Sequence, residues 1–430
     1  MHPRASSFEH DRWTAAVIGL GYVGLPMAIT AAERGLDVIG FDISQERVDS
    51  VSAGRSHVED VTDEQLGRAL AGGARFTTDE TLLREADAIV IAVPSPLGRN
   101  RQPDMSYIES ASQLVARNAG AGQLISLEST TYPGTTEDYV VAALDAAGLK
   151  LDEDVFVTFS PERVDPGNVL HTAQIPKVVG GVTPLSGEIG AAAYRRLVDH
   201  VHLVSSARAA ELAKLLENTY RAVNIAMVNE LAQVANVFDI DIWEVIDAAA
   251  SKPFGFQPFY PGPGVGGHCI PLDPQFLAWR AREMKVATRF IDLAEDVNLH
   301  MPDYVVSRVT ELLNQDGKPL FGARIVGVGL AYKRNIADER ESPSMDVLRL
   351  LERRGAVLSV FDPHVPDERI VAHRFTPVEP GHLGEQDLAI VLTDHDAIDY
   401  PGLAAGVPKV FDTRGVYRRL GTMPDNVVSL

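Results

Sequence analysis

The sequence contains a single cysteine, Cys269, in 430 residues, and its basic side chains are outnumbered by acidic ones. One thiol excludes an internal disulfide framework and a cysteine-rich metal site, so no metal is expected, and it fits a reducing compartment. With 39 Lys and Arg against 59 Asp and Glu, the formal net charge is -20, which disfavours a protein that grips nucleic acid over a broad surface. Any anionic ligand must therefore be met by local basic residues.

Long apolar runs are also scarce. The uncharged stretch from Trp13 to Ala32 has twenty residues and is long enough to span a bilayer. Three glycines and Pro26 interrupt it, and the acidic Glu9 and Asp11 precede it where a signal peptide would be basic. We therefore expect no membrane span and a cytoplasmic location. The composition, 45% hydrophobic and 23% charged, is that of a soluble globular protein, and the length predicts roughly two to four domains.

Short apolar runs alternate with amphipathic stretches of helix length from Thr14 to about Val204, which predicts βαβ units and a parallel sheet. The expected strands are 15–20, 38–42, 88–94, 124–129, 155–160 and 178–181. A long helix is expected from Ala207, because its apolar positions recur every three or four residues. These positions are Leu212, Leu216, Tyr220, Val223, Met227, Leu231, Val234 and Phe238.

Helices are also expected at 242–250, 275–283 and 292–313, around a Gly/Pro-rich segment from Pro253 to Pro274. A loop of this length is unusual for packing alone and is typical of a binding site. A second βα pattern begins at Arg324. Its expected strands are 324–330, 357–362, 388–393 and 410–412, with a helix at 345–353.

A glycine-rich turn, Gly19-Leu20-Gly21-Tyr22-Val23-Gly24, follows the first expected strand and opens a helix, and Asp42 ends the next strand. This context is typical of a dinucleotide site, in which the glycines bring backbone N–H groups and the helix N-terminus to a pyrophosphate. Asp42 would bind a ribose 2′-hydroxyl, which favours NAD over NADP; Arg47 softens that preference. A second pair, Gly327 and Gly329, lacks a third glycine and is either a weaker nucleotide turn or only structural.

These patterns predict an α/β protein. We expect an N-terminal Rossmann-type parallel-sheet domain over 1–204 that binds NAD. A central helical region, with one long helix and the cysteine loop, would cover 205–314. A C-terminal Rossmann-like α/β domain would cover 315–430.

Cys269 follows four glycines in the segment Pro261 to Pro274, where a thiol is either a nucleophile or inert packing. In a chain with an NAD site, a thiol can add to an aldehyde, and the product can lose hydride to give a thioester that water hydrolyses. Asp273 could orient a lysine, activate water or cap the helix that follows it. His268 is a weaker candidate for a general base, because neighbours in an extended loop point in opposite directions.

A polar stripe on the long helix could stabilise an oxyanion and help the thiol to ionise. It comprises Lys214, Asn218 and Arg221; the alternative is a solvated helix face, although asparagine is a poor helix former. Glu162 and Thr130 each follow an expected strand at the carboxyl edge of the sheet, where ligands bind in open α/β folds. Glu162 could act as a base toward water or be a loop residue paired with arginine, and Thr130 could hold water or the nicotinamide.

With these motifs, nearly the whole chain resembles the UDP-glucose/GDP-mannose dehydrogenase family, nucleotide-sugar 6-dehydrogenases. The resemblance rests on Gly19 to Pro26, the Cys269 loop, Gly329-Leu330-Ala331-Tyr332-Lys333 and Arg340-Glu341-Ser342. It implies oxidation of the C6 hydroxyl of a UDP-sugar with two NAD⁺, through an aldehyde and an enzyme thioester, to a uronic acid. It also implies a homodimer built on the long helix.

The resemblance also assigns roles to single residues. Cys269 would be the nucleophile, Lys214 and Asn218 would stabilise the oxyanion, Asp273 and Thr130 would hold water, and Glu162 would be the base for thioester hydrolysis. The cofactor-binding set would be Gly19, Gly21, Tyr22, Val23, Gly24, Asp42, Arg47, Val93, Pro94, Thr130 and Arg340. The substrate-binding set would be Glu162, Arg163, Lys214, Asn218, Arg221, Tyr260, Gly262, Gly266 and Lys333.

Two positions depart from the UDP-glucose pattern: Pro166 replaces a second glutamate, and Leu272 replaces a lysine. Together with the segments Asp165 to Asn168, Ile175 to Gly181 and Lys252 to Phe256, they resemble the UDP-N-acetylhexosamine branch. UDP-N-acetylglucosamine is therefore the first expected substrate, followed by UDP-glucose and UDP-N-acetylmannosamine. Two other classes remain open: a single-step hydroxyacid dehydrogenase, which would not need Cys269, and a nucleotide-sensing protein without activity.

Overall fold

The computed structural model describes residues 2–58, 60–98, 102–163, 172–267, 269–379, 383 and 385–430. The chain forms two compact units. The first unit comprises residues 1–217 and 275–286, and the second comprises residues 218–274 and 287–430. The division falls within one long helix, and the expected domain boundaries after residues 204 and 314 stay a prediction.

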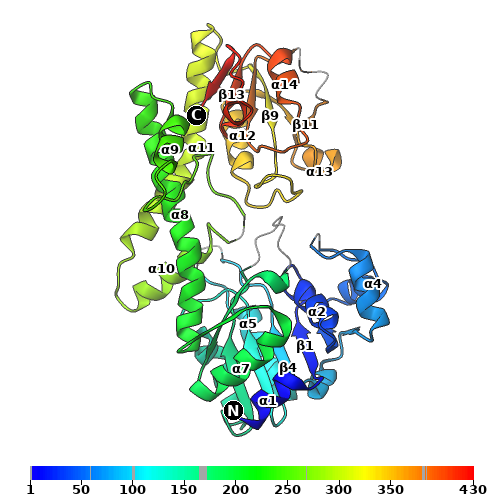
Figure 1. Ribbon diagram of the computed structural model, residues 1–430. Coiled ribbons are helices and arrows are strands. Elements are labelled where there is room, and N and C mark those ends of the chain that lie inside the picture. Colours follow the sequence, from blue (N-terminus) through cyan, green and yellow to red (C-terminus); the bar gives the residue numbers. More distant parts are fainter. Residues whose placement is uncertain are drawn as a thin grey trace. The chain divides into compact units, whose positions relative to one another are not determined.

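The first unit is built on a sheet of eight strands in the order β3-β2-β1-β4-β5-β6-β7-β8 (Figure 1). The strands are β1 (Thr14–Ile18), β2 (Asp37–Phe41), β3 (Arg75–Thr77), β4 (Ala88–Ile91), β5 (Gln123–Leu127), β6 (Val155–Phe159), β7 (Lys177–Gly181) and β8 (Val201–Val204). The helices are α1 (Pro3–His10), α2 (Gly24–Glu33), α3 (Gln45–Ser52), α4 (Asp63–Ala71), α5 (Ser106–Asn118), α6 (Ala142–Ala146) and α7 (Pro184–Leu197), with shorter turns η1 (Glu80–Glu85), η2 (Thr136–Val141) and η3 (Thr172–Gln174).

Helices cover both faces of this sheet, which explains why its central strands are mostly apolar. Successive residues of β1 enter two different cores: Val17 packs with residues of α1, α2 and α7, whereas Ile18 packs with residues of α5 and α6. A strand buried on both faces reads as a continuous apolar run. This is the pattern from which the strands were predicted.

One pairing in this sheet differs from the prediction. β6 and β7 run antiparallel, whereas β7 and β8 are again parallel. A parallel pair needs a crossover connection, usually a helix, on one face of the sheet. The described part of the segment between Phe159 and Lys177 contains the three-residue turn η3.

The central helices are α8 (Ala207–Val237), α9 (Ile242–Ala250), α10 (Asp273–Glu283) and α11 (Arg289–Gln315). The long helix is confirmed, but its large apolar side chains are largely exposed: Leu216 is 63% exposed, Met227 48% and Leu231 45%. The buried positions of α8 include smaller residues such as Ala222, Ala226 and Ala232. The predicted apolar stripe therefore faces away from the cores of this chain.

The second unit contains a sheet of six parallel strands in the order β11-β10-β9-β12-β13-β14. Its strands are β9 (Arg324–Val328), β10 (Val357–Phe361), β11 (Thr376–Pro377), β12 (Leu388–Val391), β13 (Val410–Asp412) and β14 (Val427–Ser429). Its helices are α12 (Pro343–Arg353), α13 (Asp367–Ala372), α14 (Tyr400–Gly406) and α15 (Val416–Arg419). The first six strands of the first unit have the same order, so the two α/β patterns share one topology.

In the part of the chain that the structure describes, no helix is long and apolar enough to cross a membrane.

Glu211 of α8 links this helix to the start of η2 through buried hydrogen bonds within the first unit. Its side chain is buried, and its two carboxylate oxygens accept three hydrogen bonds from the start of η2: Gly134 N at 2.6 Å, Thr136 N at 2.9 Å and Thr136 Oγ1 at 2.7 Å. Burial raises the pKa of Glu211 to about 7, against the lowering effect of these hydrogen bonds.

This raised pKa predicts a pH-dependent stability. Because the pKa of Glu211 is higher in the folded than in the unfolded chain, its contribution is complete below about pH 4 and is lost as the pH rises through 7, by roughly 3 kcal/mol. We expect Glu211→Gln to flatten the fall in melting temperature between about pH 5 and 7. Glu188→Gln, at an exposed position of α7, is the matched control. An unchanged pH slope in Glu211→Gln would contradict the assignment.

Candidate active site

The glycine-rich turn connects β1 to α2 with very little room. A Cβ atom at Gly24 would lie 1.8 Å from the carbonyl oxygen of Gly19, and one at Gly19, where φ is +93°, would lie 2.6 Å from that of Ala92. At Gly21 a Cβ would meet nothing within 4 Å, so the backbone there borders open space. Tyr22 is 53% exposed and Val23 is partly buried. The turn therefore presents its backbone at the carboxyl end of β1, beside the switch point between β1 and β4.

Asp42 follows β2 and braces this turn. Its side chain is 4% exposed; Oδ2 accepts from Leu20 N and Oδ1 from Ser44 N, both at 2.9 Å. Arg47 Nη1 lies 3.5 Å from Oδ2 and is half exposed. Asp42 thus holds the backbone of the glycine-rich turn in place. Its contact with a ribose hydroxyl stays a prediction.

The segment after β5 carries Thr130 and touches the segment after β4. Ser129 Oγ donates to the carbonyl of Val93 at 2.7 Å, so Thr130 and the predicted cofactor residues Val93 and Pro94 come from adjacent strand ends. Thr130 and Val93 are half-buried, and Pro94 is exposed. The far end of the Thr130 segment is the turn that Glu211 holds.

Glu162, after β6, forms an ion pair with a lysine. Its Oε2 lies 2.9 Å from Lys177 Nζ, and the same ammonium lies 2.9 Å from Glu128 Oε2. Arg163 pairs instead with Glu217 of α8, Nη2 to Oε1 at 2.6 Å. Lys214, one turn before Asn218 on α8, is 9% exposed and belongs to the first unit.

The cysteine loop belongs to the second unit, and its thiol is exposed. The carbonyl of Cys269 accepts a hydrogen bond from Asp273 N at 2.9 Å, at the first residue of α10. Asp273 is 3% exposed, and its Oδ2 accepts from Asn218 Nδ2 at 2.5 Å. The structure therefore brings together three predicted catalytic residues. His268 and the segment Asp165 to Asn168 lie outside the described residues.

The glycines of this loop pack against the segment that carries Lys333 and Arg340. A Cβ at Gly266 would lie 2.7 Å from Pro343 Cδ and 2.8 Å from Tyr332 Cβ. Lys333 is half-buried, and Arg340 forms a bidentate pair with Asp338, at 2.8 and 2.6 Å. The loop and this segment thus form one packed structure within the second unit.

The remaining predicted substrate residues also lie in the second unit. Arg221 is half-buried, and Tyr260 is 46% exposed and stacks on Trp243 with ring centroids 5.4 Å apart. Gly262 is buried; its N–H donates to Asn229 Oδ1 at 3.0 Å, and a Cβ there would lie 2.8 Å from Arg414 Nη1. The guanidinium of Arg414, which was not among the predicted site residues, therefore borders the cysteine loop.

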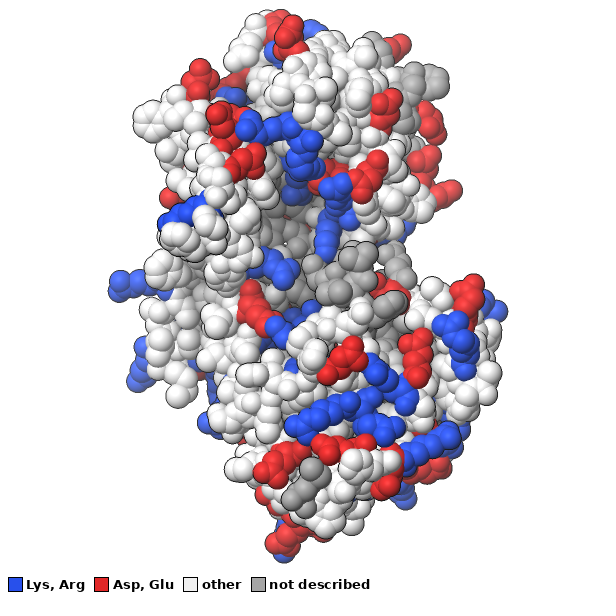
Figure 2. All heavy atoms as spheres, in the orientation of Figure 1, with Lys and Arg blue, Asp and Glu red and all other residues white. Residues whose placement is uncertain are grey.

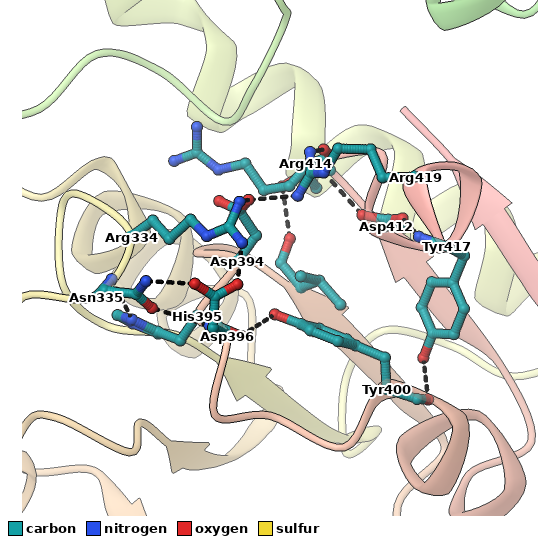
Figure 3. Close-up of polar contacts among 12 residues, drawn as sticks. Arg334, Asn335, Asp394, His395, Asp396, Tyr400, Asp412, Arg414, Tyr417 and Arg419 are labelled. Atoms are coloured by element: carbon teal, nitrogen blue, oxygen red, sulfur yellow. Dashed lines mark hydrogen bonds and ion pairs between the residues drawn. The ribbon is translucent and has the colours of Figure 1, made fainter. Parts of the chain in front are cut away.

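Figure 3 shows the polar network around Arg414 at the carboxyl ends of the second sheet. Arg414 Nε donates to the carbonyl of Leu392 at 2.7 Å, and burial lowers its pKa. Asp394 pairs with Arg419, and Arg334 pairs with Asp396. On the face drawn in Figure 2, Lys and Arg side chains lie among Asp and Glu side chains.

Three domain models of one family match the chain: the NAD binding domain of the UDP-glucose/GDP-mannose dehydrogenase family over residues 13–198, its central domain over 208–300 and its UDP binding domain over 327–419. The chain belongs to this family.

Three relatives span almost the same length. The chain is 37% identical to an NDP-N-acetyl-D-galactosaminuronic acid dehydrogenase of Ralstonia nicotianae, covering 96% of this chain and 98% of that protein. It is 36% identical to a UDP-N-acetyl-D-glucosamine 6-dehydrogenase of Pseudomonas aeruginosa, covering 88% and 90%. A solved UDP-D-ManNAc dehydrogenase from Pyrococcus horikoshii is 30% identical with a TM-score of 0.88, covering 97% and 98%.

These findings confirm the family, the fold class and the expectation of an NAD-dependent oxidoreductase that acts on a UDP-sugar. The nucleotide-sensing alternative is thereby set aside. The individual catalytic and binding roles stay predictions.

Four residues with buried polar contacts were not predicted as site residues from the sequence: Glu128, Lys177, His395 and Arg414. Lys177 is the first residue of an apolar strand, where a lysine is unusual and could have been a signal. His395 is fully buried and its Nε2 lies 3.0 Å from Asp362 Oδ2. Its Nδ1 accepts from Asn335 N at 2.9 Å, so the geometry fixes the proton on Nε2.

Asp362 is the counterpart of Asp42 in the second sheet. Its Oδ2 accepts from Leu330 N and Ala331 N, at 2.6 and 3.0 Å, and its Oδ1 accepts from His364 N and Val365 N, at 2.8 and 3.0 Å. Although burial opposes ionisation, the bonds from His395 and the backbone lower the pKa of Asp362 to about 2.

Asp362→Asn should therefore destabilise the protein, because one amide group would face two backbone N–H donors, at a cost of roughly 2–4 kcal/mol in the free energy of unfolding. The pKa of Asp362 is lower in the folded chain, so its contribution of roughly 2 kcal/mol is present above about pH 4 and is lost as the pH falls toward 2. Urea unfolding between pH 5 and 2 should show a weaker pH dependence in Asp362→Asn. Asp367→Asn, at an exposed position, should behave like wild type.

Proposed function

We propose that this enzyme oxidises the C6 hydroxyl of a UDP-N-acetylhexosamine to the carboxylate in two NAD-dependent steps, through a thioester on Cys269. The observation that carries the proposal is the exposed thiol of Cys269, whose carbonyl accepts a hydrogen bond from the backbone of Asp273, the residue whose buried carboxylate accepts from Asn218. UDP-N-acetylglucosamine stays the first candidate, because the chain follows the N-acetylhexosamine pattern around Pro166 and Leu272. The relatives named above act on N-acetylated sugars by their names, which supports this class over UDP-glucose.

The overall reaction would consume one water and two NAD⁺ for each sugar, and would give the carboxylate, two NADH and three protons. NAD, bound at the Gly19–Gly24 turn with Asp42, Arg47 and Arg340, would supply the hydride acceptor. Cys269 would add to the aldehyde carbon, and Lys214 and Asn218 would stabilise the charge on its oxygen. In the last step Glu162 would take a proton from the attacking water, which Asp273 and Thr130 hold, and the thiolate of Cys269 would leave.

The second unit would provide most groups for the UDP moiety. Lys333 and Arg221 offer positive charge near a diphosphate, and we add Arg414, because its guanidinium lies against Gly262 of the cysteine loop. The need to keep Cys269 reduced supports a cytoplasmic location.

Incubation of the enzyme with NAD⁺ and single UDP-sugars should show the highest kcat/KM for an N-acetylhexosamine and two NADH for each acid formed. The panel comprises UDP-GlcNAc, UDP-GalNAc, UDP-ManNAc, UDP-Glc and GDP-Man. Cys269→Ser should lower turnover by about 10³-fold or more, since the hydroxyl is a much weaker nucleophile at neutral pH. One NADH per sugar, or a serine variant near wild-type rate, would point to a single-step dehydrogenase instead.

We also propose a homodimer through α8. Met227, Leu231 and Val234 are each 45–48% exposed and lie on one face of the helix, so they form an apolar stripe that a second copy can cover. The double variant Met227→Glu with Leu231→Glu should shift the mass measured by light scattering from dimer to monomer. Leu420→Glu, at a position exposed to 51%, should leave the mass unchanged. A wild-type monomer, or a double variant that stays dimeric, would refute this interface.

A further inference from the structure

Lys177 is the centre of a buried ionic cluster in the first unit. Its side chain is 3% exposed, although it stands at the start of β7 in the sheet. Its Nζ donates to Glu128 Oε2 and Glu162 Oε2, both at 2.9 Å, and to the carbonyl of Pro161 at 3.3 Å. An ammonium has three hydrogens, so each finds an acceptor. Burial opposes the charged form of Lys177, but the two carboxylates raise its pKa, and the lysine is an ammonium.

Glu128 anchors the cluster on the side away from solvent. Its side chain is fully buried, and its Oε1 accepts from the hydroxyl of Tyr194 at 2.6 Å, which in turn lies 2.7 Å from Ser126 Oγ. Burial raises the pKa of Tyr194 well above its ordinary value, so the phenol keeps its proton and donates. Both oxygens of Glu128 are thus fixed, and Lys177 is held in place by a rigid partner.

Glu162 is the member of the cluster nearest to solvent, with 13% of its side chain exposed. Its Oε1 accepts from Arg163 N at 2.7 Å. The guanidinium of Arg163 bonds Glu217 of α8 and also the carbonyl of Pro176, at 2.8 Å, the residue before Lys177. Hydrogen bonds therefore hold the backbone next to Glu162, at Arg163, and next to Lys177, at Pro176.

We infer that Lys177 is a positioning residue for Glu162, which holds this carboxylate ionised and in a fixed direction while Glu128 balances the lysine's charge. The inference rests on the proposed function, in which Glu162 takes a proton from water as the water oxygen bonds the thioester carbon. The carbon–sulfur bond then breaks with its electron pair returning to Cys269. Lys177 itself touches no reacting atom in this scheme.

The charges around Glu162 predict the direction in which its ionisation shifts when a neighbouring charge is removed. Among the described residues, the charged or titratable groups facing the cluster include Lys177, Glu128 and Tyr194, with the Arg163–Glu217 pair beside it. A positive charge at this distance favours an ionised carboxylate, and a second carboxylate disfavours it. Removal of the lysine charge and removal of the Glu128 charge should therefore shift the ionisation of Glu162 in opposite senses.

The test is single-turnover kinetics of wild type, Lys177→Met, Glu128→Gln and Glu162→Gln with UDP-GlcNAc, or with the best sugar of the panel, and NAD⁺. Lys177→Met should still form NADH, should accumulate enzyme thioester visible by intact mass spectrometry, and should slow hydrolysis about tenfold at pH 7 with KM changed less than about twofold. The acid limb of its hydrolysis rate should move up by about one pH unit or more. Glu128→Gln should move that limb down, and Lys177→Arg should restore part of the rate.

The controls separate this inference from loss of folding. Lys150→Met, at a lysine 70% exposed and paired with Glu153, should match wild type. If Lys177→Met does not fold, the double variant Glu128→Gln with Lys177→Met, which leaves no unpaired charge at Glu128, should fold and show the same accumulation of thioester. A folded Lys177→Met with a wild-type acid limb and no thioester, or a Glu128→Gln whose limb does not move, would overturn the inference.

The same kinetic experiment gives different results if the proposed function itself is wrong. If Glu162→Gln hydrolyses its thioester at the wild-type rate, Glu162 is not the base, whatever Lys177 does. If neither wild type nor any variant carries a covalent sugar after acid quench, the thioester route itself is wrong.

Discussion

Buried carboxylates that accept backbone N–H groups hold the loops of this enzyme at the carboxyl ends of its strands. Asp42 binds Leu20 N in the glycine-rich turn, Asp362 binds Leu330 N and Ala331 N, and Asp412 binds Arg414 N and Tyr417 N. Loops at the carboxyl end of a parallel sheet cannot pair with a neighbouring strand, so their N–H groups need other acceptors. Removing such a carboxylate would leave buried backbone N–H donors without an acceptor, which costs folding free energy.

The buried carboxylate after the second strand has different surroundings in the two sheets, although their strand orders correspond. In the first, Asp42 has a half-exposed Arg47 beside it, and the open space at Gly21 leaves the turn accessible. In the second, Gly329 is as constrained as Gly19, because a Cβ there would lie 2.4 Å from the carbonyl of Thr393. The carboxylate of Asp362, however, carries four backbone N–H groups and the ring of His395. That position is filled by the protein itself, so the second turn differs from a dinucleotide site even though its backbone is similar.

The sequence allowed the central strands and the longer helices to be predicted because each has a periodicity set by its own neighbours. Strands buried on both faces are continuously apolar, and α9 begins and ends where the pattern does. The short edge strands β3, β8, β11 and β14 were not predicted because they have two to four residues and only one neighbouring strand. The direction of β7 was also missed, since it depends on a connection and not on the strand's own residues.

Periodicity also left open which side of α8 is covered. The regular stripe through Leu216, Met227 and Leu231 is exposed, whereas alanines on other positions are buried. A helix that packs closely on its own chain favours small residues, and the larger ones remain for another surface. The pattern thus predicted the helix correctly but did not say which partner its apolar face meets.

The candidate site was predictable where one segment carries the signal, as in the glycine-rich turn and the cysteine loop. It was not predictable where partners are far apart in sequence. Lys177 lies 49 residues from Glu128 and 15 from Glu162, and His395 lies 33 residues from Asp362. Neither a lysine within an apolar run nor a histidine after a strand belongs to a local periodic pattern that would indicate its ionic partner. Such pairs become visible only when the sheet order places the strand ends side by side.

These pairings explain how an acidic chain can serve an anionic substrate. Net charge acts over the whole surface and is screened within about 8 Å at physiological salt, so it decides little inside a packed site. Inside, Asp362 and Asp412 have their oxygens committed to backbone N–H groups, and Glu128 and Glu162 share the ammonium of Lys177. Arg414 bonds a backbone carbonyl through Nε, while its Nη1 lies against Gly262 of the cysteine loop. The charge around each of these groups is therefore set by its own hydrogen-bond partners, and the formal net charge of -20 does not decide it.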